Sequence, residues 1–587
     1  MATVTPTSET PTSDRYKWTA LSNTTLGVFM ASLDASIVII SLPAIFRGIH
    51  LDPLLPSNIG YLLWMLMGYL VVTAVLVVTF GRIGDILGRV KMYNLGFAVF
   101  SGASIALSLT PFVGPSGAMW LIVWRVVQGI GGALLLANST AILTDAFPVQ
   151  ERGLAMGISM IAAMAGSFIG LVVGGILADT DWRLVFWVNV PFGIFGTVWA
   201  YMKLRELGQR QVAKIDWWGN VTFGVGLVMV LIGITYGIQP YGGHTMGWTS
   251  PLVMFTLFGG IALLVLFVWI ERQVNDPMFD LSLFRIRAFA AGNLAGLLAA
   301  IGRGGLQFML IIWLQGIWLP LHGYSFESTP LWAGIYMLPM TAGFLVSGPV
   351  SGWLSDRYGA RPFATGGMIV SAATFLMLMW LPPNFSFPIF AFLIFLNGVG
   401  SGLFAAPNTT AVMNSVPANQ RGAASGMRAT FMNSGMVLSI GIFFSLMIAG
   451  LASSLPHTLG SGLIAQGVPA ADAARISHLP PVGTLFAAFL GYNPIRTLLG
   501  PHVLGALPPT HAAYLTGKAF FPQLISKPFM HGLRIVFSAA ALMSVIAAAA
   551  SWLRGGKYVH DEVGPFGAPA EDEPATDAPL PDEWVPA

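Results

Sequence analysis

Long apolar runs recur along this chain, and they constrain its fold more than any other feature. A helix of about 20 apolar residues spans the hydrocarbon core of a bilayer. Only 9% of the residues are charged, against about 25% in soluble domains. We therefore predict an all-α polytopic membrane protein with about fourteen helices, near 20–46, 58–80, 92–110, 117–144, 153–178, 184–204, 217–238, 249–271, 288–318, 329–354, 363–382, 386–413, 422–450 and 529–553.

Basic residues are concentrated in the loops on one side of these helices. Examples are Arg82, Lys91 and Lys203, whereas the short loops on the other side hold only Arg47 and Arg183. Loops rich in Lys and Arg stay in the cytoplasm. Because the number of helices is even, both termini are expected in the cytoplasm. We expect a multi-pass protein of a plasma (inner) membrane, and a bacterial source.

Three segments differ in composition from the apolar runs. Residues 1–17 are rich in Thr, Ser and Pro, and residues 556–587 are rich in Pro and acidic, so we expect two disordered cytoplasmic tails. The extracytoplasmic loop 451–530 is too long to be featureless. It contains apolar pieces at 485–490 and around 520–529, which we expect to cap the outer mouth or lie in the membrane interface.

The composition also argues against several classes of site. The chain has no cysteine, so it has no thiolate nucleophile and no cysteine-based metal site. No His-rich cluster, nucleophile elbow or phosphate loop is recognisable, and the net charge is only +3. We expect no enzyme activity, no metal, no cofactor and no nucleic-acid partner.

Short motifs repeat at a nearly constant offset. The segment 81–89 recurs 271 residues later, the asparagine at 138 recurs as Asn408, and Arg152 recurs as Arg421. Both copies follow the same kind of basic loop, which indicates two halves related by an axis along the membrane normal. We expect a six-helix bundle at 18–210, two inserted helices at 211–287, and a second six-helix bundle at 288–555.

Several motifs identify a family. They are Gly81-x-x-x-Asp85-x-x-Gly88-Arg89-x-Lys91, Leu33-Asp34-Ala35, Arg125-x-x-Gln128-Gly129, Asn189-Val190-Pro191-Phe192-Gly193, and Gln315 followed by Gly323-Tyr324. Over about 18–555, apart from the long loop, the chain resembles the major facilitator superfamily, in its branch of fourteen-helix drug:proton antiporters. The resemblance implies two six-helix bundles plus two central helices, and transport by alternating access.

Helix 5 departs from the family pattern. The antiporter motif usually reads Gly-Pro-x-x-Gly-Gly, and here Leu171 stands where the proline is expected. The glycines at 166, 170 and 174 keep their four-residue spacing, which allows helices to approach closely. We therefore assign Gly166, Gly170 and Gly174 to helix packing.

Asp34 is the acidic residue in the middle of a membrane-length run. A charge at the bilayer centre costs at least about 2.5–3.5 kcal/mol, so such residues are usually functional. We interpret Asp34 as a proton-exchanging group. The resemblance links Arg125, which has an apolar counterpart near Ile394 in the second half, to proton handling beside it. The alternative is a permanent buried ion pair.

The cytoplasmic loop motif has a different predicted role. Resemblance implies that Gly81, Asp85, Gly88, Arg89 and Asp356 form a conformational latch that holds the cytoplasmic side closed. The alternative is that these residues only cap helices and set topology.

Arg303 falls near the middle of helix 9, too deep to reach the interface comfortably. It either binds an anionic group, such as a lipid phosphate, or pairs with Asp34 across the halves. The other candidates for a substrate cavity are Gln315, Asn138, Asn408 and Trp64, and the candidates for a gate are Arg421 and Arg428.

The sequence thus favours a monomeric, proton-coupled exporter of lipophilic or amphiphilic small molecules that works among membrane lipids. A second hypothesis keeps the fold and makes the cargo an envelope lipid or lipid-like metabolite. A third hypothesis is a non-transporting receptor or assembly protein.

Overall fold

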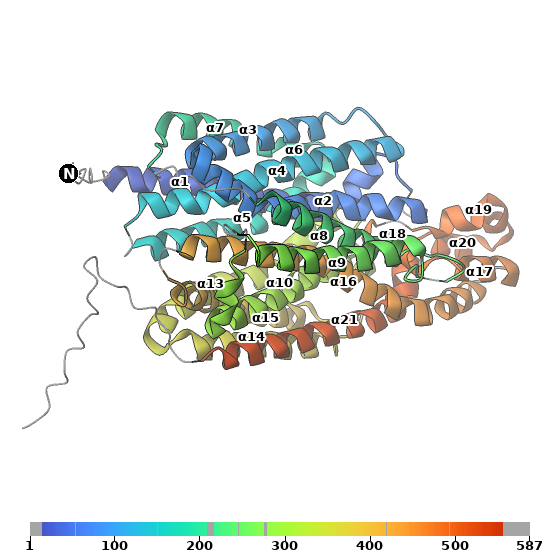
Figure 1. The fold of residues 1–587 in the computed structure, drawn as a ribbon. Coiled ribbons are helices and arrows are strands. Elements are labelled where there is room, and N and C mark those ends of the chain that lie inside the picture. The colour runs from blue at the N-terminus through green and yellow to red at the C-terminus, as the bar shows by residue number, and fades with distance from the viewer. Residues whose placement is uncertain are drawn as a thin grey trace, which may run out of the picture.

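Fourteen helices long and apolar enough to cross a membrane are present in the described residues, as the sequence predicts. The computed structural model describes residues 14–52, 55–148, 151–207, 216–244, 246–274, 277, 279–417, 420–491 and 493–555. The tails expected at 1–17 and 556–587 therefore lie outside it, except that residues 14–17 already belong to the first helix. The helices run side by side in one all-helical bundle (Figure 1).

The first half of the bundle is built from the helices before residue 204. In it α1 packs against α5, and α4 packs against α2 and α3, while α7 covers α3. The bounds are α1 (Asp14–Gly48), α2 (Pro56–Leu87), α3 (Arg89–Ser108), α4 (Gly114–Ala146), α5 (Arg152–Thr180), α6 (Leu184–Trp187) and α7 (Asn189–Lys203).

The glycine ridge of α5 lies against α1. A Cβ added at Gly166 would lie 2.4 Å from the carbonyl oxygen of Phe29, and one added at Gly170 would lie 2.5 Å from that of Leu33. At Gly174 it would lie 3.0 Å from the carbonyl oxygen of Ile37. The two backbones are in contact, so only a residue without a side chain fits.

The second half has the same kind of packing. Here α15 packs against α13 and α14, and α21 packs against α10, α14 and α16. The bounds are α10 (Arg287–Trp313), η3 (Leu314–Trp318), α11 (Leu319–Leu321), α12 (Thr329–Tyr336), α13 (Leu338–Tyr358), α14 (Ala360–Leu378), α15 (Phe387–Asn414), α16 (Arg421–Ile464) and α21 (Phe520–Leu553), preceded by the short 3-10 helix η2 (Leu281–Arg285).

The sequence repeat is visible at one sharp corner in each half. Gly88 has φ +111° between α2 and α3, and Gly359 has φ +83° between α13 and α14. Positive φ is accessible mainly to glycine, so each copy of the repeated motif needs a glycine at this turn.

Helices α8 (Trp217–Gly237) and α9 (Pro251–Glu271) pack against each other. Helix α8 also contacts α2 of the first half and α16 of the second. The Thr79 hydroxyl donates a hydrogen bond to the Asn220 side chain, which ties α2 to α8. Helix α8 therefore lies along the edge where the two halves meet, and α9 packs on α8.

Two helices are much longer than the sequence predicted. Helix α16 continues to Ile464 and α21 begins at Phe520. At 1.5 Å per residue, the 44 residues of α16 extend about 66 Å, roughly twice the thickness of a hydrocarbon core. Their projecting ends carry α17 (Ala470–Ser477), α18 (Pro481–Phe489), α19 (Ile495–Ala506) and α20 (Pro509–Leu515) at one end of the bundle (Figure 1).

Helix α18 enters the space between the halves, and all nine of its residues are buried. Its ring contacts are with the second half: Phe489 lies 5.5 Å from Phe308, and Phe486 lies 5.1 Å from Phe444, between ring centroids. The apolar piece expected at 485–490 therefore forms a cap that is inserted into the bundle.

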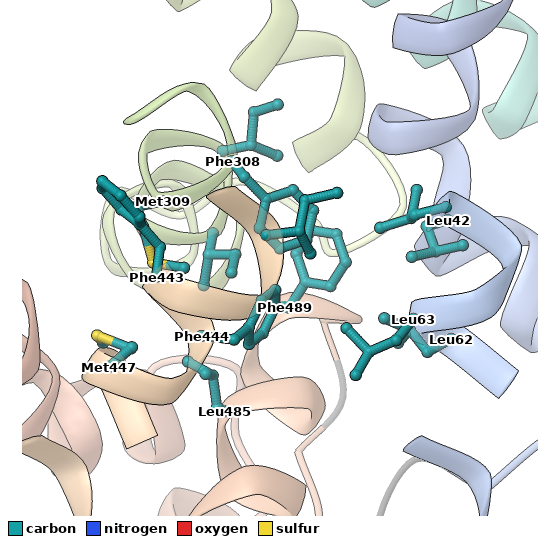
Figure 2. Packing of buried hydrophobic residues seen from close by; sticks show 14 of the residues in the cluster. Leu42, Leu62, Leu63, Phe308, Met309, Phe443, Phe444, Met447, Leu485 and Phe489 are labelled. Carbon is teal, nitrogen blue, oxygen red and sulfur yellow. The ribbon is translucent and has the colours of Figure 1, made fainter. Parts of the chain in front are cut away.

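Residues of the first half lie on the other side of α18. Figure 2 shows Leu42, Leu62 and Leu63 facing Phe489 across the cluster that also contains Leu485. Helix α18 contacts α2, α10, α16 and η3. It closes this end of the space between the halves with apolar side chains.

Candidate functional site

Five polar side chains meet inside the first half, far from its surface. They are Asp34 of α1, Ser104 of α3, Arg125 and Gln128 of α4, and Asn189 of α7, and each is at most 2% exposed. Asp34 lies near the middle of its 35-residue helix. A polar group left unpaired at this depth costs several kcal/mol, so most of the polar atoms here are expected to have partners.

The Asp34 carboxylate accepts hydrogen bonds from three donors. Arg125 Nη1 donates to Oδ2, while Gln128 Nε2 and Asn189 Nδ2 donate to Oδ1 at 2.9 and 2.7 Å. Gln128 also accepts from Arg125 Nη1 at 2.6 Å and donates to Ser104 Oγ at 2.9 Å. The network joins helices α1, α3, α4 and α7.

The Arg125 guanidinium has further contacts on α2. It lies 4.6 Å from the centroid of the Tyr69 ring, and its Nε donates to the carbonyl oxygen of Met65 at 3.4 Å. A cation over an aromatic face keeps part of its stabilisation when a carboxylate partner is neutralised. Arg125 is thus held in place by groups other than Asp34.

Three members of this network, Gln128, Asn189 and Ser104, had no role in the sequence analysis. Gln128 stands three residues after Arg125, a spacing that places both on one face of α4. Asn189 begins α7 directly after the break that separates it from α6. Gln128 could have been found from the helical spacing. The role of Asn189 depends on a contact with Asp34, which lies 155 residues earlier in the chain.

Arg89 is the centre of a second polar cluster, just beyond the C-terminal end of α2. Its Nε donates to Asp85 at 2.9 Å and its Nη1 to Asp145 at the end of α4 at 2.5 Å. The backbone N–H groups of Arg89 and Val90 donate to Glu206. The side chain of Asp356 lies outside the described residues, so the polar contacts of the corresponding turn in the second half are not compared with those of Asp85.

The glycines of the loop motif differ in their surroundings. Gly81 has open space where a Cβ would be, whereas Gly88 has the positive φ of the corner. The geometry ties α2, α3 and α4 of one half together through Arg89 and Asp85.

Asn138 and Asn408, two of the candidates for a substrate cavity, make contacts between helices inside their own halves. Asn138 Nδ2 donates to Leu134 of its own helix, and its side chain abuts Gly84 of α2. Asn408 Nδ2 donates to the Gly292 carbonyl at 3.0 Å, and its Oδ1 accepts from Arg554 at 2.7 Å.

Gln315 lies between the halves. It is fully buried in η3, a short π-helical segment, and its Nε2 donates to the Ile40 carbonyl of α1 at 3.5 Å. Its Oε1 has no hydrogen-bond partner among the described residues. The next residue, Gly316, lies against the backbone of Ala488 in α18. Short π-helical segments such as η3 are frequent at functional sites.

Arg303 does not pair with Asp34, which is bound by Arg125 instead. Its guanidinium lies 5.2 Å from the centroid of the Phe344 ring, and no ion pair joins it to another described residue. Arg428 donates to Thr409 Oγ1 at 2.5 Å. Trp64 is half-buried on α2, and the side chain of Arg421 lies outside the described residues.

The chain is similar to bacterial resistance proteins over most of its length. It is 26% identical to the tetracenomycin C resistance and export protein of Streptomyces glaucescens, over 91% of this chain and 90% of that protein. It is 28% identical to the multidrug resistance protein Stp of Mycobacterium tuberculosis, over 87% of this chain and 93% of that protein.

Solved structures support the same fold. A bacterial homologue of the human lysosomal transporter Spinster, in an inward-facing and occupied conformation, matches with a TM-score of 0.54 at 14% identity, covering 92% of this chain and 97% of that one. The family model of the Major Facilitator Superfamily matches residues 24–440. The chain is therefore a member of the Major Facilitator Superfamily, and it is a membrane transporter rather than an enzyme.

Proposed function

We propose that this protein is a proton-driven exporter of lipophilic small molecules and that Asp34 is its proton carrier. The observation that supports this most directly is the burial of the Asp34 carboxylate among three donors from two other helices. A carboxylate that holds helices together more strongly in its charged form makes their packing depend on protonation.

The proposed step needs no group beyond this network. When Asp34 takes up a proton, it loses its charge, and its ion pair with Arg125 is replaced by a weaker neutral contact. Arg125 keeps its contacts with Tyr69, Met65 and Gln128. Helix α1 is then less strongly bound to α4 and α7, and the half can change its packing during alternating access.

The cargo is proposed from the relatives and the apolar interior. Relatives are named for resistance to drugs and for export of tetracenomycin C. Near α18 the two halves meet through Phe, Met and Leu side chains (Figure 2). If the halves separate during transport, these side chains would offer an adaptable apolar surface to lipophilic molecules of varied shape. From the distribution of basic loops, we also propose that the protein lies in a plasma membrane with both termini on its cytoplasmic side.

The test is export of a lipophilic dye from proteoliposomes of the purified protein under an imposed pH gradient. We expect Asp34→Asn to abolish gradient-driven export, because the amide keeps the shape of the side chain but cannot carry a proton. The control is Asp179→Asn, the same chemical change at an exposed position on α5. It should export as the parent does.

Two outcomes would count against the proposal. Equal gradient-driven export by Asp34→Asn would remove Asp34 from the coupling. Absence of export by folded parent protein, for several dyes, would favour the hypothesis that the cargo is an envelope lipid or a lipid-like metabolite. Thermal unfolding of each variant, measured in parallel, separates loss of coupling from loss of fold.

A second candidate cargo is an amphiphilic anion, such as an envelope lipid. The observation that favours it is Arg303, a half-buried cation in α10 with an aromatic contact and no carboxylate partner among the described residues. Arg303→Gln should then reduce export of anionic amphiphiles and leave export of neutral dyes unchanged, as measured in the same proteoliposomes.

A further inference from the structure

A groove lies where α21, α16 and the connection between α14 and α15 meet, at the end of the bundle that carries α17 to α20. Its volume is about 560 Å³. Helix α21 lines one side with Lys527, His531 and Arg534. The groove belongs to neither the Asp34 network nor the α18 cluster.

The groove has a cationic wall that nothing in its lining neutralises. Lys527, His531 and Arg534 are spaced four and three residues apart, so they lie on one face of α21. All three are exposed, and none forms an ion pair with another described residue. No Asp or Glu is among the residues that line the groove. A positive potential is therefore directed at whatever occupies it.

Helix α16 supplies hydroxyl groups to the lining of the groove. Ser453 and Thr458 of α16 donate to backbone carbonyls of their own helix, at 2.8 and 3.0 Å. The Oγ of Ser454 is buried and has no hydrogen-bond partner among the described residues. That hydroxyl is free to donate to an oxygen in the groove, as a phosphate would provide.

The groove lies at the depth of lipid headgroups. Arg534 precedes the end of α21 at Leu553 by 19 residues, which is about 28 Å along the helix and close to the thickness of a hydrocarbon core. Trp380, two residues beyond the end of α14, also lines the groove and is 86% exposed. Trp at this depth is typical of the membrane interface.

The helices below the groove present an apolar surface to the membrane. Leu376 on α14 and Leu542 and Val545 on α21 are 49%, 61% and 54% exposed. The two helices pack against each other, and Ser538 Oγ of α21 contacts Met379 Sδ at 3.7 Å. A molecule with an anionic head in the groove could thus extend its tails along this surface.

We propose that this groove binds the phosphate headgroup of an anionic phospholipid from the adjacent leaflet. Lys527 and Arg534 bind the phosphate oxygens, Ser454 donates to one of them, and Trp380 covers the glycerol region. The bound lipid bridges α16 and α21, the two helices whose projecting ends carry α17 to α20. This site does not depend on the proposed proton coupling, so Asp34→Asn should bind lipid as the parent does.

The test is native mass spectrometry of the purified full-length protein titrated with phosphatidylglycerol and, separately, with phosphatidylcholine. We expect one phosphatidylglycerol to bind at least tenfold more tightly than phosphatidylcholine. The triple variant Lys527→Gln/His531→Gln/Arg534→Gln should lose this preference. Its control, Arg496→Gln/His502→Gln/Lys518→Gln, makes the same three changes at exposed positions between α18 and α21 that do not line the groove.

The buried hydroxyl on α16 provides a second variant that leaves the cationic wall intact. Ser454→Val removes this hydroxyl without changing charge and should weaken phosphatidylglycerol binding severalfold, even if the triple variant fails to fold. An unchanged preference in both folded groove variants would overturn the site. Inorganic phosphate or glycerol 3-phosphate that competes with the lipid at equal concentration would show a site for free phosphate and overturn the lipid assignment.

Discussion

At the scale of single residues, the Asp34 network shows why one carboxylate can be tolerated in the middle of an apolar helix. Its two oxygens accept from Arg125, Gln128 and Asn189, so neither oxygen is left unpaired. Removing one partner from a buried ion pair costs about 3–5 kcal/mol, because the other charge stays buried. The pair is therefore more sensitive to single substitutions than to a double one.

This argument predicts the outcome of a double-mutant cycle. Arg125→Gln alone should lower the free energy of unfolding by about 3–5 kcal/mol, because it leaves the Asp34 carboxylate without a cation. Adding Asp34→Asn should restore a large part of that loss, since no unpaired charge remains. Reversible unfolding in mixed micelles measures both. Strictly additive effects would show that the two side chains do not interact.

At the scale of elements, the contact between α1 and α5 sets the position of Asp34. The glycines of α5 allow the backbone of α1 to approach within van der Waals distance, next to Leu33. The proline expected in this motif is absent, and α5 is a continuous helix from Arg152 to Thr180. The spacing of small residues, and not the proline, provides the close approach.

A matched pair of substitutions on α5 tests this contact. Gly170→Ala should destabilise the protein by about 1–3 kcal/mol, because its Cβ would overlap the Leu33 carbonyl oxygen. Gly157→Ala, with nothing within 4 Å of the added Cβ, should be neutral or stabilising by up to about 1 kcal/mol. Thermal unfolding in detergent compares them. Equal effects of the two variants would contradict the role assigned to the ridge.

The ends of α16 and α21 show what hydropathy does and does not report. The apolar run of α16 stops near residue 450, yet the helix continues to Ile464 through polar residues such as Ser453 and Ser454. Hydropathy measures how much of a helix lies in lipid. It does not measure where the helical hydrogen bonds end, because in water a polar sequence can continue the helix.

At the scale of the whole molecule, α18 adds to the direct contacts between the two halves, such as those of α16 with α2 and of α12 with α5. Its side chains pack against the second half at Phe308 and Phe444, and against α2 of the first half (Figure 2). The cap must leave this position whenever the halves separate at this end. Apolar contacts of α18 therefore oppose opening there.

Cysteine labelling tests this closure, because the chain contains no cysteine of its own. A single cysteine at Leu63, which faces α18, should react slowly with a maleimide in the parent background. Phe489→Asp should raise the rate at least tenfold by displacing α18, whereas Phe489→Leu should not. A cysteine at the exposed Arg475 should react quickly in every background. A rate at Leu63 that is insensitive to Phe489→Asp would show that α18 does not close the space.

The sequence by itself determined the membrane class, the fourteen helices, the repeat and the family, and it singled out Asp34 and Arg125. These depend on local composition, on the length that a bilayer imposes and on motifs contiguous in the chain. Tertiary structure decided which cation meets Asp34, that Asn189 joins it, that Asn138 and Asn408 hold helices together, and that α18 enters the bundle. Those outcomes depend on which faces of distant helices are turned toward each other, and the residues along a single helix do not specify that.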